Sequence, residues 1–186
     1  MQRPTLRIVA FGLNKGLAQG QLGILLRPAG PLAHFIQEER SMIMAPKLTL
    51  ADARIVLEGA ETKAKAIGVP MDIAAVDDGG HLLAFIRMDG ARVTSIDVSI
   101  NKAFTAACAR RGTHEYAAIA GAGGPAFGMH TSNQGRFMIV GGGLPIFIGG
   151  MIAGGVGASS GSPEQDREVC QAGIDQLMAA LDDNPT

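Results

Sequence analysis

Three charged side chains lie near the ends of predicted elements and could bind or convert an anionic molecule. Arg87 and Asp89 lie at the end of a predicted strand, and Lys102 lies beside the apolar stripe of the next predicted helix. Arginine and lysine hold carboxylates through charge-assisted hydrogen bonds, and Asp89 and Lys102 are the candidates for a catalytic acid or base. The ordinary interpretation is a surface ion pair at the strand end and a solvated lysine on the helix.

A glycine-rich segment offers the second half of such a site. Gly141, Gly142 and Gly143 lie between two apolar runs, with Pro145 close behind. This composition predicts a turn, because glycine and proline are unfavourable inside helices and central strands. A glycine turn exposes amide N–H groups that suit a carboxylate or phosphate oxygen. If the fold brings this turn to Arg87, the residues form a small cationic pocket; the alternative is a tight turn that binds nothing.

His130 is the histidine that we expect to be free to meet a ligand. It lies in the segment 121–161, which holds 14 of the 26 glycines and which predicts either flexible loops or backbone lining a site. His34 belongs to the N-terminal region, and His81 and His114 begin predicted elements. No two histidines show the spacing of metal ligands, so the sequence predicts no protein metal site.

The pattern of apolar residues and turn signals predicts an α+β fold with one antiparallel sheet. Hairpin turns join the predicted strands, and there is no strand–helix alternation of a nucleotide-binding fold. Capping signals begin the first helix at Thr49 and the last one at Ser162. The predicted elements are a helix from Thr49 to Ile67, strands 71–76 and 81–88, a helix from residue 95 to 111, a short helix from Thr113, strands 136–140, 144–149 and 151–158, and a helix from 163 to 181.

Composition excludes several classes of function. The chain of 186 residues has a formal net charge of −1, which does not favour nucleic-acid binding, and no apolar run approaches the ~18 residues of a membrane helix. Only two cysteines occur, which weakly favours a reducing, cytoplasmic location. A secreted location stays open, because Arg3 and Arg7 precede a short apolar run.

Residues 1–46 differ from the rest of the chain. The first 37 residues carry four basic residues and no acidic ones, and glycines and prolines interrupt every apolar run. We interpret 1–46 as a non-core N-terminal arm or an upstream extension, and 47–186 as the folded domain.

Seven segments of the domain resemble the GlcG/HbpS family of haem-binding proteins, which also forms the C-terminal domain of PduO-type proteins. They occur in the family's order and span roughly 49–181. The matching segments are residues 49–53, 76–80, 85–91, 101–106, 142–146, 155–161 and 164–166. The resemblance implies a profilin-like sandwich, in which an antiparallel sheet of about five strands is flanked by helices, and a homo-oligomer.

The resemblance also implies a function, the binding of haem or a related tetrapyrrole. Arg87 and Lys102 would supply cations for the propionates, while His130 is a candidate for contact with the ligand by its loop position alone. Two alternatives stay open. One is a small enzyme that acts on an anionic carboxylate in a degradation pathway, and the other is an oligomeric structural or assembly protein.

Overall fold

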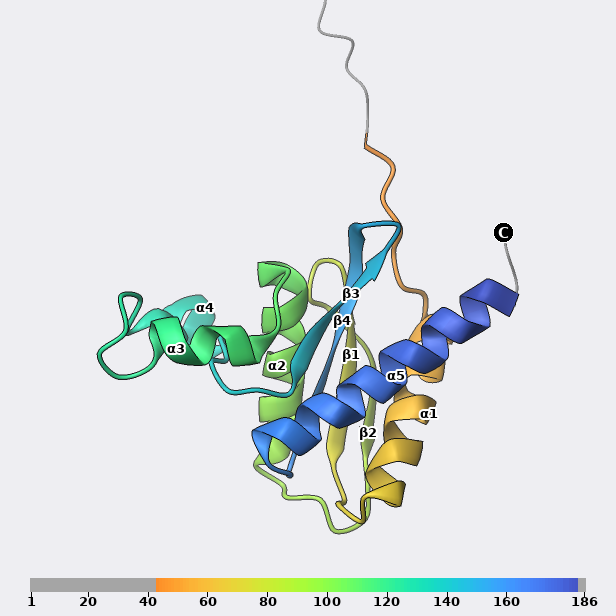
Figure 1. Ribbon diagram of the computed structural model, residues 1–186, viewed down its shortest axis with the longest axis horizontal. Coiled ribbons are helices and arrows are strands. Elements are labelled where there is room, and N and C mark those ends of the chain that lie inside the picture. Colours follow the sequence, from red (N-terminus) through yellow and green to blue (C-terminus); the bar gives the residue numbers. More distant parts are fainter. Residues whose placement is uncertain (1–42, 184–186) are drawn as a thin grey trace, which may run out of the picture. The chain divides into compact units, whose positions relative to one another are not determined.

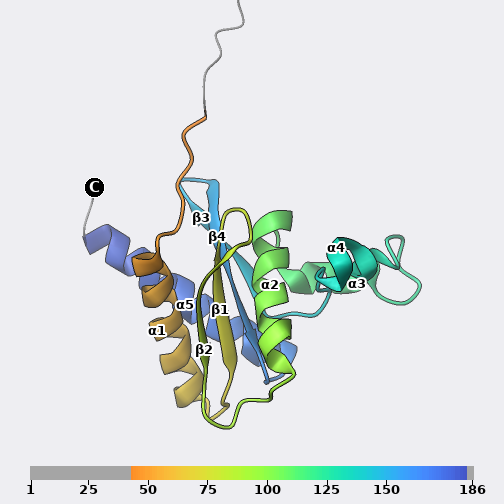
Figure 2. The same cartoon turned by 180° about the vertical axis from the view of Figure 1, so that it is seen from behind.

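The computed structural model describes residues 43–183, and these residues form four strands, several helices and a long excursion (Figures 1 and 2). The predicted arm therefore lies largely outside the described residues, and its boundary at residue 46 stays a prediction. The elements in chain order are α1 (Leu50–Ala66), β1 (Asp72–Asp77), β2 (Leu82–Arg87), α2 (Ser95–Ala109), η2 (Thr113–Tyr116), α3 (Ala117–Ala120), η3 (Met129–Thr131), α4 (Ser132–Gly135), β3 (Gly143–Ile148), β4 (Met151–Ser159) and α5 (Pro163–Asp183).

The capping signals act as the sequence predicts. Thr49 and Asp52 form a reciprocal capping box at the start of α1, in which the Asp52 amide donates to Thr49 Oγ1 at 3.2 Å. Ser162 and Gln165 make the same exchange at the start of α5, with distances of 2.9 and 3.3 Å. Each box satisfies amide groups that the first turn of a helix leaves without an intrahelical partner, so both helix starts are fixed locally.

The sheet is antiparallel and has four strands in the order β2-β1-β4-β3, not the five that the sequence predicts. The missing strand is the run 136–140, which has no strand structure. Its approach is bent by left-handed backbone at Asn133 and Gln134, and the Met138 amide donates to the Thr105 hydroxyl of α2. The run 136–140 therefore packs beside α2, because its Met138 amide binds a side chain of that helix instead of a neighbouring strand.

Helices cover both faces of the sheet (Figures 1 and 2). Helices α1 and α5 pack against each other and against one face, where Ile73, Ile146 and Val156 form the main core. Helix α2 covers the other face over Ala74 and Val76. Burial of these apolar side chains is the main source of stability for such a layered domain.

Glycines allow α2 to approach the sheet closely. A Cβ atom on Gly155 would lie 2.7 Å from the Ala103 carbonyl oxygen, and one on Gly157 would meet the Ser99 carbonyl oxygen. Gly143 is the register partner of Gly157 and lies under the Lys102 carbonyl in the same way. Part of the glycine density in 121–161 therefore serves helix–sheet packing.

The segment from η2 to α4 leaves the sheet and projects beyond α2 (Figure 1). Its longest side chains are only partly covered, and Phe127 at the tip is 66% exposed. Within residues 43–183, no helix has the length and apolar character needed to cross a membrane.

Candidate functional site

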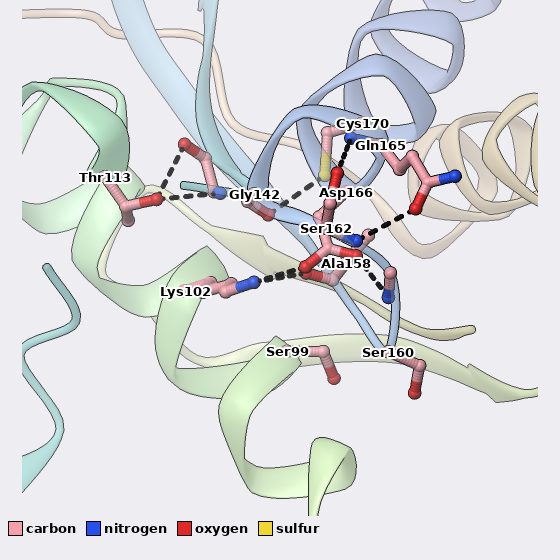
Figure 3. A network of polar contacts seen from close by, with 12 residues as sticks. Ser99, Lys102, Thr113, Gly142, Ala158, Ser160, Ser162, Gln165, Asp166 and Cys170 are labelled. Carbon is pink, nitrogen blue, oxygen red and sulfur yellow. Dashed lines mark hydrogen bonds and ion pairs between the residues drawn. The ribbon is translucent and has the colours of Figure 1, made fainter. Parts of the chain in front are cut away.

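Lys102 is buried and forms an ion pair at the centre of a polar network (Figure 3). Its side chain is 2% exposed, and its Nζ lies 2.7 Å from Asp166 Oδ2 and 3.0 Å from the Ala158 carbonyl oxygen. Two of the three donors of the ammonium are therefore engaged within the domain. The side chain that the sequence offered as a ligand-binding or catalytic group joins α2 to β4 and α5.

Asp166 is nearly as buried as its partner. Burial raises the pKa of the Asp166 carboxyl, while the Lys102 ammonium and the Gly161 amide act in the opposite direction. Its Oδ2 accepts from Lys102, and its Oδ1 accepts from the Gly161 amide at 2.9 Å. Both oxygens thus have partners, as an ionised carboxylate needs when it is removed from water.

The glycine turn is part of the same network. The Gly142 carbonyl accepts from the Ala158 amide at 2.8 Å and from Cys170 Sγ at 3.2 Å. The Gly143 amide donates to the Thr113 hydroxyl at 2.9 Å. All three glycines are buried, so this turn packs inside the domain and the Gly143 amide already has a partner.

Arg87 lies at the same end of the sheet but on the far strand. Its register partner on β1 is Asp72, whose partner on β4 is Ser159. Three strand spacings of about 4.8 Å separate β2 from β3, so Arg87 and the glycine turn are roughly 14 Å apart across the sheet. The polar cavity that Arg87 lines is accordingly not lined by any of the three turn glycines.

Arg87 and Asp89 do come together. They line one polar cavity of about 300 Å³ together with Met88 and Gly90. Asp72, beside Arg87, is fully buried, and its Oδ1 has no hydrogen-bond partner among the described residues. Burial raises the pKa of the Asp72 carboxyl, and the Arg87 charge opposes this effect.

His130 lines a separate, mostly apolar pocket of about 300 Å³ on the projecting segment. Phe137, Met138, Ile139 and Val140, the run expected to form a strand, supply its apolar walls. The His130 Nδ1 is buried without a hydrogen-bond partner in the described chain. His130 thus lines a cavity that neither Arg87 nor Lys102 lines, and its contact with a ligand stays a prediction.

The two largest of the cavities described for residues 43–183 lie between η2, the start of β3 and α5. Two adjacent hollows of about 600 and 380 Å³ share His114, Leu144 and Gln171 as lining residues. We call them together the His114 groove. Its other lining residues are Gly112, Glu115, Pro145, Phe147, Glu164, Arg167, Glu168, Ile174 and Met178.

The groove has an apolar floor and a charged rim. Phe147 and Met178 remain 41% and 37% exposed there, so both apolar side chains are accessible to a ligand or partner. Among the rim acids, Glu168 pairs with Lys63 at 2.6 Å and Glu115 with Arg111 at 3.3 Å. Arg167 has no ion-pair partner within 43–183, so its charge is available to an anionic group.

His114 is the groove residue whose side chain could bind a metal ion. Its Nδ1 is buried and has no hydrogen-bond partner in the described part of the chain, and its ring packs against Gly112. Neutral imidazole is a common ligand of iron and other metals. The sequence predicts only that His114 begins a helix, and Pro145 is the one groove residue that it offers as a site residue. No spacing along the chain indicates that residues near 114, 144 and 167 meet.

No cluster of three or more histidine, cysteine or acidic side chains in residues 43–183 is arranged to hold a bare metal ion. A four-stranded antiparallel sheet between two helical layers, with a histidine-containing groove at its β3 edge, defines a small α+β domain with a candidate ligand site.

Comparison with known proteins identifies the family. Residues 48–175 match the family model described as haem degrading protein HbpS-like, and the chain belongs to this family. The resemblance inferred from the seven segments is thereby confirmed.

Relatives with known sequences support the same assignment. The chain is 44% identical over 69% of its length to an uncharacterized 15.0 kDa protein of Citrobacter freundii from the dhaT-dhaS intergenic region, and the match covers 90% of that protein. It is 31% identical over 68% of its length to the corrinoid adenosyltransferase PduO of Salmonella typhimurium, but the match covers only 38% of PduO.

Two solved structures share the fold. The Klebsiella pneumoniae protein ORFY is 38% identical, with a TM-score of 0.72 and coverage of 75% of this chain and 96% of that one. A complex of PduOC with haem is 30% identical, with a TM-score of 0.67 and coverage of 70% and 94%.

Proposed function

We propose that this protein binds haem or a related tetrapyrrole in the His114 groove. The observation that carries the proposal is the His114 imidazole, which lines the largest of the cavities described above. Membership of the HbpS-like family and the haem complex of PduOC favour this ligand class.

The residues of the groove fit such a ligand. His114 would hold the iron, the floor around Leu144 and Phe147 would cover the apolar macrocycle, and Arg167 would pair with a propionate. The bound iron would supply the redox or ligand-exchange chemistry. The larger hollow lies well within the roughly 300–1,000 Å³ typical of small-molecule sites, whereas the His130 pocket lies at the lower limit and has no charged lining residue.

Haem titration of the purified full chain tests the proposal. We expect a shifted Soret band in the wild type, its loss in His114→Ala, and its retention in His130→Ala. Arg167→Gln should keep the band and weaken affinity by about tenfold, the effect of one charge-assisted hydrogen bond. An unshifted band in the wild type, or loss of the band only in His130→Ala, contradicts the proposed site.

The second candidate function is the binding or conversion of a small carboxylate. It is supported by Arg87, which has no ion-pair partner in residues 43–183 and shares a cavity with Asp89. Asp89 would be the acid or base there, while Lys102 is engaged in its ion pair. A thermal-shift screen of dicarboxylates and hydroxy acids tests this, because Arg87→Gln should abolish any stabilisation and His114→Ala should preserve it.

We also propose that the protein forms a homo-oligomer. Phe127 on the projecting segment is 66% exposed, and Val140, between α4 and β3, is 45% exposed; association with a second copy would cover such apolar side chains. Light scattering of the wild type should give more than the monomer mass, and Phe127→Ser should lower it. A monomeric wild type at micromolar concentration contradicts this proposal.

A further inference from the structure

We infer that the buried Lys102–Asp166 ion pair positions both walls of the His114 groove, and that Thr113 transmits this constraint to His114. The inference rests on the proposed function, because it concerns the same groove. Neither member of the pair lines the groove, so both act through other residues.

The first wall is the start of α5. Asp166 lies in the first turn of this helix, between Glu164 and Arg167 of the groove rim. Its two oxygens bind Lys102 of α2 and the Gly161 amide. Since Lys102 also donates to the Ala158 carbonyl of β4, the pair fixes the first turn of α5 against both α2 and the sheet (Figure 3).

The second wall is η2, which carries His114. The hydroxyl of the preceding residue, Thr113, accepts from the Gly143 amide at 2.9 Å. The neighbouring Gly142 packs onto the ion pair so closely that a Cβ there would lie 2.5 Å from Asp166 Cβ and 2.7 Å from Lys102 Nζ. The glycine turn thus joins the pair to Thr113, and a Cβ on Gly141 would lie 3.3 Å from His114 Cβ and 3.2 Å from Pro163 Cβ at the start of α5.

Stability alone does not account for such a pair. Removing two charges from water is costly, and apolar residues of similar volume often replace a buried ion pair without loss of stability. What apolar side chains cannot supply is direction, since each hydrogen bond of the pair fixes an angle as well as a distance. The geometry therefore favours orientation of the groove walls as the function of the pair.

Amide hydrogen exchange tests this independently of haem. The variants are Lys102→Met, which leaves Asp166 unpaired, and the double variant Lys102→Met/Asp166→Leu, which removes both charges. The readout is the exchange rate of the Gly143 amide relative to amides of the central strand β1 in the same protein. We expect this ratio to rise by about tenfold in the double variant, the effect of losing one hydrogen bond, although the double variant recovers stability relative to the single one.

A second pair of variants does not disturb the buried charges. Thr113→Val removes the acceptor of the Gly143 amide, whereas Thr113→Ser keeps a hydroxyl there. We expect Thr113→Val to raise the same exchange ratio and to shift the nitrogen resonances of the His114 imidazole, and Thr113→Ser to restore both. With haem, Thr113→Val and the double variant should each weaken binding by about tenfold and move the Soret maximum, and Val76→Ala, a core substitution outside the network, should not.

The outcomes are distinct. Wild-type exchange ratios and Soret position in the double variant would overturn the positioning inference, and so would a Thr113→Val protein with an unchanged imidazole spectrum. A wild type that binds no haem would refute the proposed function, while the exchange ratio and the imidazole spectrum would still decide the positioning role.

Discussion

Substitution of Gly142 by alanine should be among the most damaging single-methyl additions in this chain. Two independent penalties apply at this position. The backbone has a φ of +114°, outside the regions that residues with a side chain occupy readily. The added Cβ would also lie 2.5 Å from Asp166 Cβ and 2.9 Å from the carbonyl oxygen of Ala158, which belongs to the inner strand β4.

The magnitude follows from these two terms. Backbone strain at positive φ costs about 1–2 kcal/mol, and overpacking in a rigid interior costs about 1–3 kcal/mol. The lower entropy of alanine in the unfolded chain offsets about 0.4–1 kcal/mol. We expect a net loss of about 2–4 kcal/mol, a large part of the roughly 5–15 kcal/mol that stabilises a typical domain.

Two other glycines separate the penalties. Gly68 has a φ of +70° with no atom within 4 Å of the added Cβ, so Gly68→Ala tests backbone strain alone and should cost about 1 kcal/mol. Gly143 has no positive φ but lies against the Lys102 carbonyl, so Gly143→Ala tests steric overlap alone and should cost about 1–3 kcal/mol.

Urea unfolding followed by far-UV circular dichroism measures all three variants. The midpoint should fall most for Gly142→Ala and least for Gly68→Ala, at an unchanged dependence on urea. If Gly142→Ala unfolds at the same urea concentration as Gly68→Ala, the steric argument is wrong, and the packing of the glycine turn onto the ion pair is refuted.

Three further predictions concern other parts of the domain. Burial favours a raised pKa for Asp77, but the His81 amide, the Lys47 ammonium and the Gly79 amide hold it at about 2. Because this pKa is lowered on folding, the stabilisation is complete above pH 4 and is lost as the pH falls towards 2. Asp77→Asn should therefore lower the unfolding free energy by about 1–2 kcal/mol at pH 7 and by little at pH 2, measured by chemical unfolding at both pH values. The exposed control Glu58→Gln should not show this dependence on pH. Thr49→Ala removes one half of a capping box and should lower the unfolding free energy by about 1 kcal/mol, measured by thermal unfolding; no change would contradict the cap. Cys108 is exposed, although partial desolvation of its Sγ raises the pKa of the thiol, so a thiol reagent should modify it slowly in the native protein. Buried Cys170 should react only in denaturant, and equal rates would refute this assignment.

Local signals predicted the elements well where a short stretch of chain decides the structure. The cap at Thr49, the hairpin around residues 77–80 and the helix start at Ser162 each depend on residues within a few positions of one another, and the structure confirms all three. The run 136–140 is the exception. It has the apolar character of a strand, but its hydrogen-bond partner is Thr105, about thirty residues earlier in the chain.

The site could be predicted only in part. Arg87 and Asp89 share a cavity because they are close in sequence, and His130 meets a pocket formed by the residues that follow it. The pattern of α2 shows only which face Lys102 occupies, so the sequence leaves open a solvated lysine and a ligand-binding or catalytic one. Its partner Asp166 lies 64 positions later, and only packing of α5 against the sheet brings the two charges together.

The sequence by itself determined the family, the α+β class and the approximate ends of the three long helices, α1, α2 and α5, since these depend on composition, periodicity and local hydrogen bonds. The tertiary structure decided which cation is buried, which histidine faces the largest hollow and why the glycines are needed. The physical reason is that burial and pairing of a side chain are set by elements that come from distant parts of the chain, and layer packing alone brings His114, Leu144 and Arg167 to one groove.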